Sequence, residues 1–471
     1  MPRPDQNDDR ASPVILWFRN DLRLRDHAGV AAALATKRPI LPVFIWDEQA
    51  GTRPLGAASK WWLHRSLHVL DEELRKFESR LIVARGQSQV VLASIAIENH
   101  VKTIIYSHAF DPVTEEFDRN LADELRHHGI KLEPHNTTLL TEPGSLKTKE
   151  DKPFRVFTPF YKALQTSERL HVDSLVSLST RVWPKPASWL QSLAIDDLGL
   201  DKTLTPSGQD WAKGFQGFTP GERGARGALR HFLGHKLKNY EYGRDHPDLD
   251  LTSRLSPHLR FGEISPQRIL LELNKAVIAD PSLGASAAKF RAELAWREFS
   301  YSLLAQQPLL DCVNFRRDFD RFSWRNDDNG FRAWCRGETG YDLVDAGMRE
   351  LWQTGYMHNR VRMVAASFLI KHLLVDWRRG EQWFWDCLVD ADPANNPASW
   401  QWVAGCGADA APYFRIFNPI TQGDKFDPDE AYRKRYNHGR QFKPIVEHGF
   451  ARDRALAAYK SRGDDDHDHA D

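Results

Sequence analysis

The stretch VILWFR, residues 14–19, is a short run of apolar residues that ends in a charged one. Its length suits a β-strand, and an unbroken apolar run indicates a strand buried on both faces, as in a parallel sheet. Three further runs of this kind follow: ILPVFIW (40–46), LIVA (81–84) and TIIY (103–106). We therefore expect the beginning of the chain to supply the strands of one buried sheet.

Helical stretches separate these runs, the clearest over residues 58–77 and 114–128. This alternation predicts an open, doubly wound parallel sheet, an α/β domain that we place at residues 12–135. Sheets of this kind bind ligands at the carboxyl ends of their strands. The segment 136–205 is rich in Pro, Ser and Thr, so we expect an irregular connector there.

Beyond residue 206 helical periodicity dominates the sequence. The stretches FRAELAWREFSYSLLA (290–305) and NRVRMVAASFLIKHLLV (359–375) both place apolar residues at helical spacing. We therefore expect a larger, all-α domain over residues 206–460. The charged Asp/His run within residues 461–471 predicts a disordered tail.

Composition limits the class of protein. The 471 residues include 64 Lys+Arg and 64 Asp+Glu, so the formal net charge is zero and any nucleic-acid contact must use a local basic patch. No 18-residue apolar run is present, which excludes a membrane span, and the N-terminus has no signal-peptide pattern. Four cysteines without a CxxC pair are typical of a reduced, cytoplasmic protein.

The chain is unusually rich in tryptophan, with sixteen in all. Indoles usually pack in cores, but they are also readily oxidised by one electron and stack on nucleobases. Close to arginines and to an Asp/Asn-rich loop, they indicate an aromatic cofactor, a base-binding pocket, or both. Five of them cluster late in the chain: Trp377, Trp383, Trp385, Trp400 and Trp402.

Phosphate-binding motifs are limited to one candidate, since GxGxxG and GxxxxGK[ST] are both absent from the sequence. The candidate is TSRLSP (252–257), in which Ser256 followed by Pro257 predicts the N-cap and first residue of a helix. A helix N-terminus with hydroxyls and an arginine can hold a diphosphate, although plain capping explains the same residues.

Glu293, Trp296 and Arg297 have i, i+3, i+4 spacing, which places them on one helical face. They form either a surface ion pair or a pocket wall, in which Trp stacks, Glu accepts a hydrogen bond and Arg holds an anion. The stretch DADPANNP (390–397) predicts a loop between helices, because prolines interrupt helices. Its Asp and Asn side chains could read the edge of a heterocycle.

Two histidine pairs at i, i+4 spacing, His64/His68 and His231/His235, are candidate metal ligands. Neither pair carries the intervening Glu of HExxH, and we find no convincing third ligand in the sequence. We therefore expect no metal site.

Taken together, several motifs resemble the photolyase/cryptochrome flavoproteins over nearly the whole chain. WWLH (61–64) and NFRRDFDRFSW (314–324) are most similar to class III bacterial photolyases. The segment between Pro428 and Pro444 is shorter than is typical of the family. The shared motifs are LWFRNDLRLRD (16–26), TSRLSPHL (252–259), ELAWREF (293–299), GYDLVDAGMREL (340–351), MHNRVRMVAASFLIKHLLVDWRRGE (357–381), DADPANNPASWQW (390–402) and APYFRIFNP (411–419).

The resemblance implies a non-covalent FAD in the helical domain. Arg362 would pair with Asp390, and Asn396 would face flavin N5, where an Asn is typical of repair enzymes and an Asp of plant cryptochromes. The cofactor-binding positions by motif are Tyr240, Thr252, Ser253, Arg254, Leu255, Ser256, Arg297, Asn359, Arg362, Asp390, Asp392 and Asn396.

The resemblance also implies a substrate, DNA that contains a cyclobutane pyrimidine dimer, with the dimer flipped out of the duplex. Light would excite reduced FAD, one electron would split the ring, and the electron would return. Trp400, Trp377 and Trp324 match the family's chain for photoreduction, and together with Glu293 and Asn396 they form the catalytic set. The substrate-binding positions are Glu293, Trp296, Arg297, Asn359, Arg360, Met363 and Trp402.

An antenna chromophore is expected as well, in the cleft between the domains. Class III members imply 5,10-methenyltetrahydrofolate, and Glu115 aligns with a folate-contacting Glu of some relatives. We expect a monomeric, cytoplasmic DNA-repair enzyme. A cryptochrome-like photoreceptor without repair is the alternative; such proteins often carry long C-terminal extensions and lose pocket residues that this chain keeps.

Overall fold

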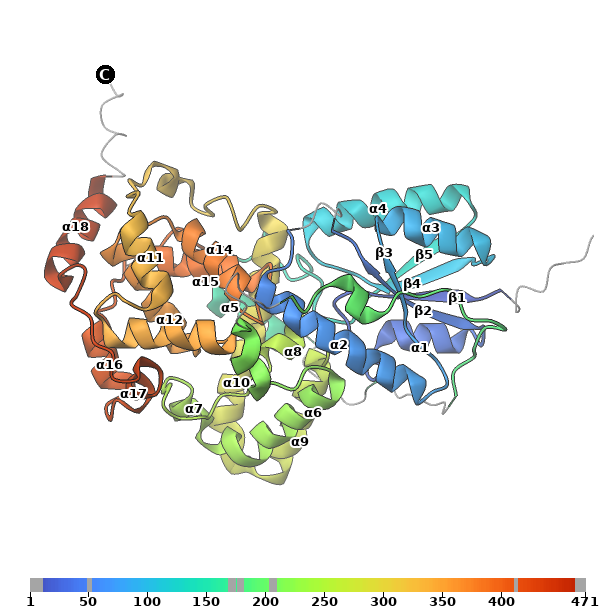
Figure 1. The fold of residues 1–471 in the computed structure, drawn as a ribbon, viewed down its shortest axis with the longest axis horizontal. Helices are drawn as coiled ribbons and strands as arrows, with labels where there is room; N and C mark the ends of the chain where they lie inside the picture. Colours follow the sequence, from blue (N-terminus) through green and yellow to red (C-terminus); the bar gives the residue numbers. More distant parts are fainter. Residues whose placement is uncertain are drawn as a thin grey trace, which may run out of the picture.

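The computed structural model describes residues 12–48, 53–167, 175, 182–202, 210–410 and 414–461. Its N-terminal part is a five-stranded parallel sheet with strand order β3-β2-β1-β4-β5 (Figure 1). The central strand places Val14 beside Ile40 on one neighbour and Thr103 on the other. The strands are β1 (Val14–Phe18), β2 (Ile40–Trp46), β3 (Ile82–Arg85), β4 (Thr103–Ser107) and β5 (Lys131–His135).

Helices cover both faces of this sheet, as expected for a doubly wound fold. Val14, Leu16 and Phe18 of β1 pack against α1 (Ala28–Ala35) and α2 (Ala57–Arg75). The alternate residues Ile15 and Trp17 pack on the other face, against α3 (Ser88–Glu98) and α4 (Pro112–His127). The α/β prediction and its four strands are confirmed. The fifth strand was not predicted, because KLEPH is polar; its Pro134 is tolerated at the edge of a sheet.

The rest of the described chain is helical, which confirms the predicted all-α domain (Figure 1). The predicted helix 359–375 is interrupted: α13 (Asn359–Ser367) is followed by a π-helical turn at Phe368–His372. The helices are α6 (Glu222–His231), α7 (Tyr240–Gly243), α8 (Ser256–Arg260), α9 (Pro266–Ala279), α10 (Gly284–Gln306), α11 (Asp328–Arg336), α12 (Asp342–Thr354), α13 (Asn359–Ser367), α14 (Trp377–Cys387), α15 (Asn395–Ala404), α16 (Pro419–Phe426), α17 (Ala431–Asn437) and α18 (His448–Ser461).

The connector at 136–205 is less irregular than predicted. It contains helix α5 (Phe157–Thr166), whose Phe157, Phe160 and Leu164 are buried in the core of the helical domain. Farther along, Trp183 and the short 3-10 helix Ile195–Leu198 pack with the core around α2. The connector therefore contributes to both cores, and the expectation of a purely irregular segment is wrong because these apolar side chains find buried positions.

The short segment between Pro428 and Pro444 is largely exposed and is anchored by two buried residues, Tyr432 and Asn437. It contains α17, whose Tyr432 hydroxyl donates to Glu350 Oε2 at 2.6 Å. Just beyond the segment, the Ile445 N–H donates to the Thr339 carbonyl at 3.0 Å. The predicted disordered tail, apart from Ser461 at the end of α18, lies outside the described residues.

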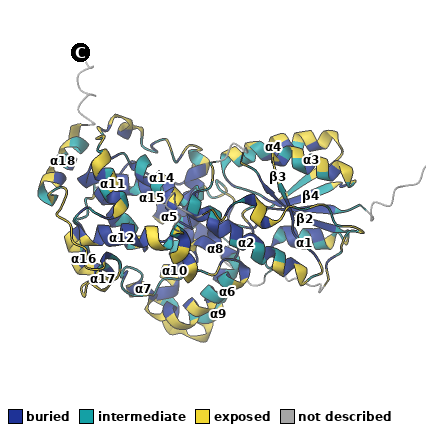
Figure 2. Ribbon diagram, viewed as in Figure 1, coloured by how far each residue is buried: buried dark blue, intermediate teal, exposed yellow. Residues whose placement is uncertain are grey.

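The two domains share a buried junction, and burial continues from the sheet across α2 and α8 into the helical domain (Figure 2). Arg23, which is 1% exposed, donates to the carbonyls of Thr137 (2.6 Å) and Gly262 (2.8 Å). It also donates to Asp26, so its guanidinium joins the α/β domain, the connector and the helical domain. Among the described helices none is long and apolar enough to cross a membrane.

Candidate functional site

Asp390, Arg362 and Ser256 form a polar cluster in the helical domain, with the buried carboxylate of Asp390 at its centre. Arg362 of α13 donates to its Oδ2 at 2.9 Å, which confirms the predicted pair. The Ser256 hydroxyl donates to the same oxygen at 2.6 Å. Within the described chain, the other oxygen, Oδ1, is buried without a hydrogen-bond partner. Because buried polar atoms are normally paired, this oxygen marks a place for a donor from a bound ligand.

Two guanidinium groups converge beside this carboxylate. Arg254 lies 5.5 Å from the Tyr356 ring, and Arg362 lies 5.2 Å from the same ring. Arg254 has a φ of 52°, an uncommon backbone conformation for a residue with a side chain. It follows Thr252 and Ser253, whose hydroxyls are only partly exposed. This combination of two cations with hydroxyls suits a diphosphate.

Two details of the sequence prediction are corrected here. Ser256 is the first residue of α8 and not its N-cap; its hydroxyl binds Asp390 instead of capping the helix. Pro397 does not end the 390–397 loop, because α15 already begins at Asn395 and proline is tolerated in the first turn of a helix.

Asp392 holds the shape of this loop. Its Oδ1 accepts the N–H groups of Ala394 (2.9 Å) and Asn395 (2.8 Å), and its Oδ2 accepts the Tyr301 hydroxyl at 3.0 Å. Both oxygens are therefore committed to the protein. Asp390, in contrast, keeps an oxygen that has no partner among the described residues.

Asn396, in the first turn of α15, is buried beside a second carboxylate. Its amide nitrogen donates to Glu381 Oε1 at 2.8 Å and to the Glu381 carbonyl at 3.2 Å. Glu381 in turn forms a two-pronged ion pair with Arg53, at 2.6 and 2.8 Å. Glu381 and Arg53 were not predicted as site residues, because their contact joins positions 328 residues apart and no local spacing indicates it.

Glu293 and Arg297 diverge from a shared helix, α10. Glu293 forms an ion pair with Arg244, the residue that follows α7. Arg297 is buried, donates to the Thr138 carbonyl at 2.9 Å and lines the interdomain cavity. Glu293 and Arg297 thus contact different neighbours, since long side chains at i, i+4 can turn apart, and a shared pocket wall stays a prediction.

The remaining predicted substrate contacts lie on several elements. Trp296 stacks on Phe157, with ring centroids 3.7 Å apart, and stays partly exposed. Trp402 is also partly exposed and donates to the Asp409 carbonyl at 3.1 Å. Arg360 pairs with Asp245 at 2.8 Å. Asn359 is exposed and Met363 partly buried on the same helix, α13, so these residues offer aromatic, cationic and amide groups together.

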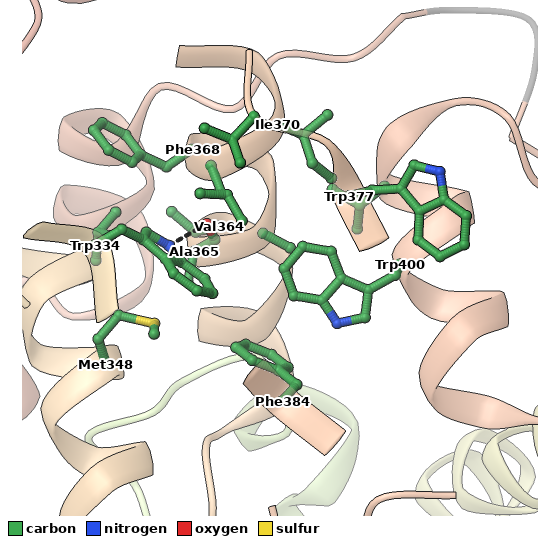
Figure 3. Close-up of a cluster of buried hydrophobic side chains, with 14 of the residues drawn as sticks. Trp334, Met348, Val364, Ala365, Phe368, Ile370, Trp377, Phe384 and Trp400 are labelled. Atoms are coloured by element: carbon green, nitrogen blue, oxygen red, sulfur yellow. Dashed lines mark hydrogen bonds between the residues drawn. The ribbon is translucent and has the colours of Figure 1, made fainter. Parts of the chain in front are cut away.

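The three tryptophans predicted for electron transfer share one hydrophobic cluster. Trp400 and Trp377 are buried in this cluster (Figure 3). Trp324 packs against it and is partly exposed. A Cβ on Gly380 would lie 2.3 Å from the Trp400 ring, so this glycine permits the close approach. The Trp377 indole donates to Asn314 Oδ1 at 2.9 Å. Trp400 and Trp377 therefore place oxidisable rings inside the domain, and Trp324 places one near its surface.

A cavity of about 750 Å³ lies between the domains, where a doubly wound sheet is expected to bind ligands. Aromatic residues Trp17, Phe44 and Phe110 line it together with Arg19. Glu115, the predicted antenna contact, pairs with His108 of the wall at 3.6 Å. The wall of the cavity thus combines aromatic rings with the guanidinium group of Arg19.

Glu298, beside Arg297, supplies a pH-dependent contribution to stability. Burial raises its pKa to about 7 from the usual 4.5, while Arg297 and the N–H groups of Leu140 and Thr141 oppose the rise. The folded protein therefore holds a proton that the unfolded chain releases, and this contribution is lost as the pH rises from about 4.5 to 7. It amounts to at most about 3 kcal/mol.

Glu298→Gln, which is neutral at every pH, should remove this slope from the free energy of unfolding, measured by urea titration between pH 5 and 7. Glu272→Gln is the control and should keep the slope. Glu272 is partly exposed; burial raises its pKa, but its bonds to Arg268 and Lys275 outweigh this and lower the pKa overall. An unchanged slope in Glu298→Gln would contradict the assignment.

The histidine pair on α2 has a partner that the sequence did not reveal. Nε2 of His64 and Nε2 of His68 each lie 2.9 Å from Asp196 Oδ1, in the connector. The three ligand atoms lie within 4.8 Å of one another. The expectation that no third ligand exists is therefore wrong, because Asp196 is brought to α2 by folding of the connector.

Comparison with known proteins agrees with this arrangement. Residues 14–177 match the DNA photolyase model, and residues 290–439 match the FAD binding domain of DNA photolyase. The chain is 45% identical to a deoxyribodipyrimidine photo-lyase of Agrobacterium fabrum, over 96% of this chain and 98% of the relative. It is 34% identical to cryptochrome-1 of Arabidopsis thaliana, over 90% of this chain and 62% of the relative.

Among solved structures, a bacterial class III photolyase from Agrobacterium tumefaciens superimposes with a TM-score of 0.90 at 43% identity, covering 98% of this chain and all (100%) of that one. Both halves of the chain are included in these matches, the sheet domain with its cavity and the helical domain with its polar cluster. The chain therefore belongs to the DNA photolyase family.

Proposed function

We propose that this protein is a light-driven DNA repair enzyme that uses FAD to split cyclobutane pyrimidine dimers. The observation that carries the proposal is the buried, unpaired Oδ1 of Asp390, held in place by Arg362 and Ser256. A ring N–H of an isoalloxazine is the type of donor that this oxygen lacks. The near-full-length similarity to deoxyribodipyrimidine photo-lyases supports the same activity.

Further residues of the chain would contact FAD. Arg254 and Arg362 would bind the diphosphate, and the hydroxyls of Thr252 and Ser253 would add hydrogen bonds. Asn396 would present its amide oxygen to the flavin. When bound, FAD supplies the absorption of blue light and the electron that passes to the dimer and back. The protein's part is to position the reactants and exclude water.

The flipped-out dimer would lie against the partly exposed face of the helical domain. Trp296 and Trp402 would stack on its apolar sides, and Arg360 would contact a phosphate. Glu293, now paired with Arg244, would accept hydrogen bonds from the damaged bases. Asn359 and Met363 would complete the pocket. The pocket residues and Asn396 favour repair over a photoreceptor role without repair.

We further propose that the interdomain cavity holds an antenna chromophore, 5,10-methenyltetrahydrofolate. The aromatic lining suits a pterin ring, and Arg19, Lys60 and Arg260 on the wall suit the carboxylates of a glutamyl tail. Loading the protein with this folate should add an absorption band that sensitises repair.

The test of repair uses the full chain, chemically reduced without air, mixed with an oligonucleotide that contains one thymine dimer. Blue light should restore thymine absorbance, and darkness should not. No recovery with reduced FAD demonstrably bound would contradict dimer repair, and a (6-4) lesion would be tried next.

The Glu293→Ala protein should retain its FAD but repair dimers with about tenfold lower yield, because a hydrogen bond to a charged group is removed. The measurement is the quantum yield of thymine recovery at full FAD occupancy. Glu241→Ala, an exposed glutamate on the neighbouring helix α7, is the matched control and should repair normally. Equal yields in the two variants would reject the role of Glu293.

A further inference from the structure

The beginning of α2 docks closely onto α14 of the helical domain. The Trp385 indole donates to the Pro54 carbonyl at 2.8 Å. At Gly56 the chains approach so closely that a Cβ would lie 2.1 Å from the Trp385 carbonyl oxygen. These contacts fix the segment around residue 53 against α14, although it belongs to the α/β domain.

Arg53 extends from this segment to a carboxylate inside the helical domain. Its two terminal nitrogens contact the two oxygens of Glu381 at 2.6 and 2.8 Å, and its guanidinium lies 4.2 Å from the centre of the Trp385 ring. The Glu381 side chain is only 1% exposed. A carboxylate this buried stays ionised only if it is paired, and burial raises the pKa of Glu381 while Arg53 lowers it.

The charge of Glu381 decides which way Asn396 faces. An ionised carboxylate can only accept hydrogen bonds, so the Asn396 amide nitrogen must point toward Glu381, as the 2.8 Å bond requires. The amide oxygen is then left on the opposite side. If Glu381 took up a proton from solvent, its O–H could donate to the amide oxygen. The amide could then turn and present its nitrogen, at the loss of only the longer, 3.2 Å bond to the Glu381 carbonyl.

We propose that Arg53 is a positioning residue that sets the redox preference of the flavin site through Glu381 and Asn396. The proposal rests on the proposed function, since it requires FAD beside Asn396. Reduced flavin carries N5–H, which an amide oxygen accepts, whereas oxidised flavin has a bare N5, which suits an amide N–H. Arg53 therefore favours the reduced form. Because Arg53 also lines the interdomain cavity, the α/β domain reaches the redox site by this path.

The experiment is a redox titration of FAD in the full-length protein against a reference dye. Arg53→Gln should keep its FAD but shift the reduction equilibrium about tenfold toward oxidised flavin, the ratio expected for one hydrogen bond. For a two-electron couple this is a fall of about 30 mV in midpoint potential. Arg53→Lys should recover part of the shift. Arg85→Gln, which breaks an exposed pair with Glu48 in the same domain, should leave the potential unchanged.

A second pair of variants separates this path from a charge effect through space. In an Asn396→Ala background, Arg53→Gln should no longer change the potential; an equal fall there would overturn the proposal. If Arg53→Gln does not fold, Arg53→Gln/Glu381→Gln leaves no unpaired charge and should show the same fall. A parent protein that binds no FAD would reject the proposed function. A parent that binds FAD and repairs dimers, with an unchanged potential in Arg53→Gln, would reject this inference alone.

Discussion

The Arg362→Ala protein is expected to lose most of its FAD and about 3 kcal/mol of unfolding free energy. Arg362 is the cation paired with Asp390, whose side chain is 3% exposed, and removal of one partner of a buried pair leaves an uncompensated charge. The same guanidinium is one of two that would bind the diphosphate. The measurements are the ratio of flavin to protein absorbance after gel filtration and a urea unfolding curve.

Two further variants separate the two losses. Arg379→Ala removes an arginine from a largely exposed pair with Asp328 and should change neither quantity appreciably. Arg362→Ala/Asp390→Asn removes both charges of the pair, so no unpaired charge remains there. It should regain much of the stability without regaining FAD. Full FAD occupancy in Arg362→Ala would show that the diphosphate is bound elsewhere.

The Trp377→Phe protein is expected to lose photoreduction of oxidised flavin almost completely, while the chemically reduced enzyme still repairs dimers. Trp377 is fully buried in the cluster that also contains the buried Trp400 and the partly exposed Trp324, and a phenyl ring is much harder to oxidise than an indole. The variant also loses the hydrogen bond to Asn314 and some volume, at a cost of about 1–3 kcal/mol. Flavin absorbance under blue light with an external thiol follows the reaction.

Trp334→Phe provides a closely matched control. Trp334 is equally buried, lies 6.2 Å from Trp400 and donates one hydrogen bond, to the Ala365 carbonyl at 2.9 Å (Figure 3). It should lose similar stability but retain photoreduction. If photoreduction is lost in Trp334→Phe and kept in Trp377→Phe, the electron reaches the flavin through Trp334 and not through Trp377.

Most of the fold could be predicted because burial leaves a direct mark on sequence. The runs at 14–18 and 40–46 are apolar throughout because both faces of an interior parallel strand are covered. Strand β5 has one neighbouring strand only, so it tolerates the polar KLEPH and carries no such mark. Helix α5 was missed for another reason: its ten residues follow Pro- and Thr-containing sequence that resembles a loop.

The site was predictable where motif positions match and unpredictable where contacts are distant. The pair of Arg362 and Asp390 was predicted from the resemblance and is present. Glu381 and Arg53 are 328 residues apart, and no local spacing reveals their contact. Arg297 was placed with Glu293 because they share a helical face, but the direction of a long side chain depends on its tertiary neighbours.

The guanidinium of Arg23 has a consequence for how such proteins can be recombined. It donates to Gly262 and Thr137 from a fully buried position, so a cut between the domains would remove two of its acceptors and leave it only the carbonyls of Arg25 and Asp26. Gly262 itself has a φ of 61°, and a Cβ there would lie 2.3 Å from the Asn20 carbonyl. The domains are thus not interchangeable modules. A chimera that takes its sheet domain from a relative must also preserve this arginine, this glycine and the backbone at Asn20 that approaches the glycine.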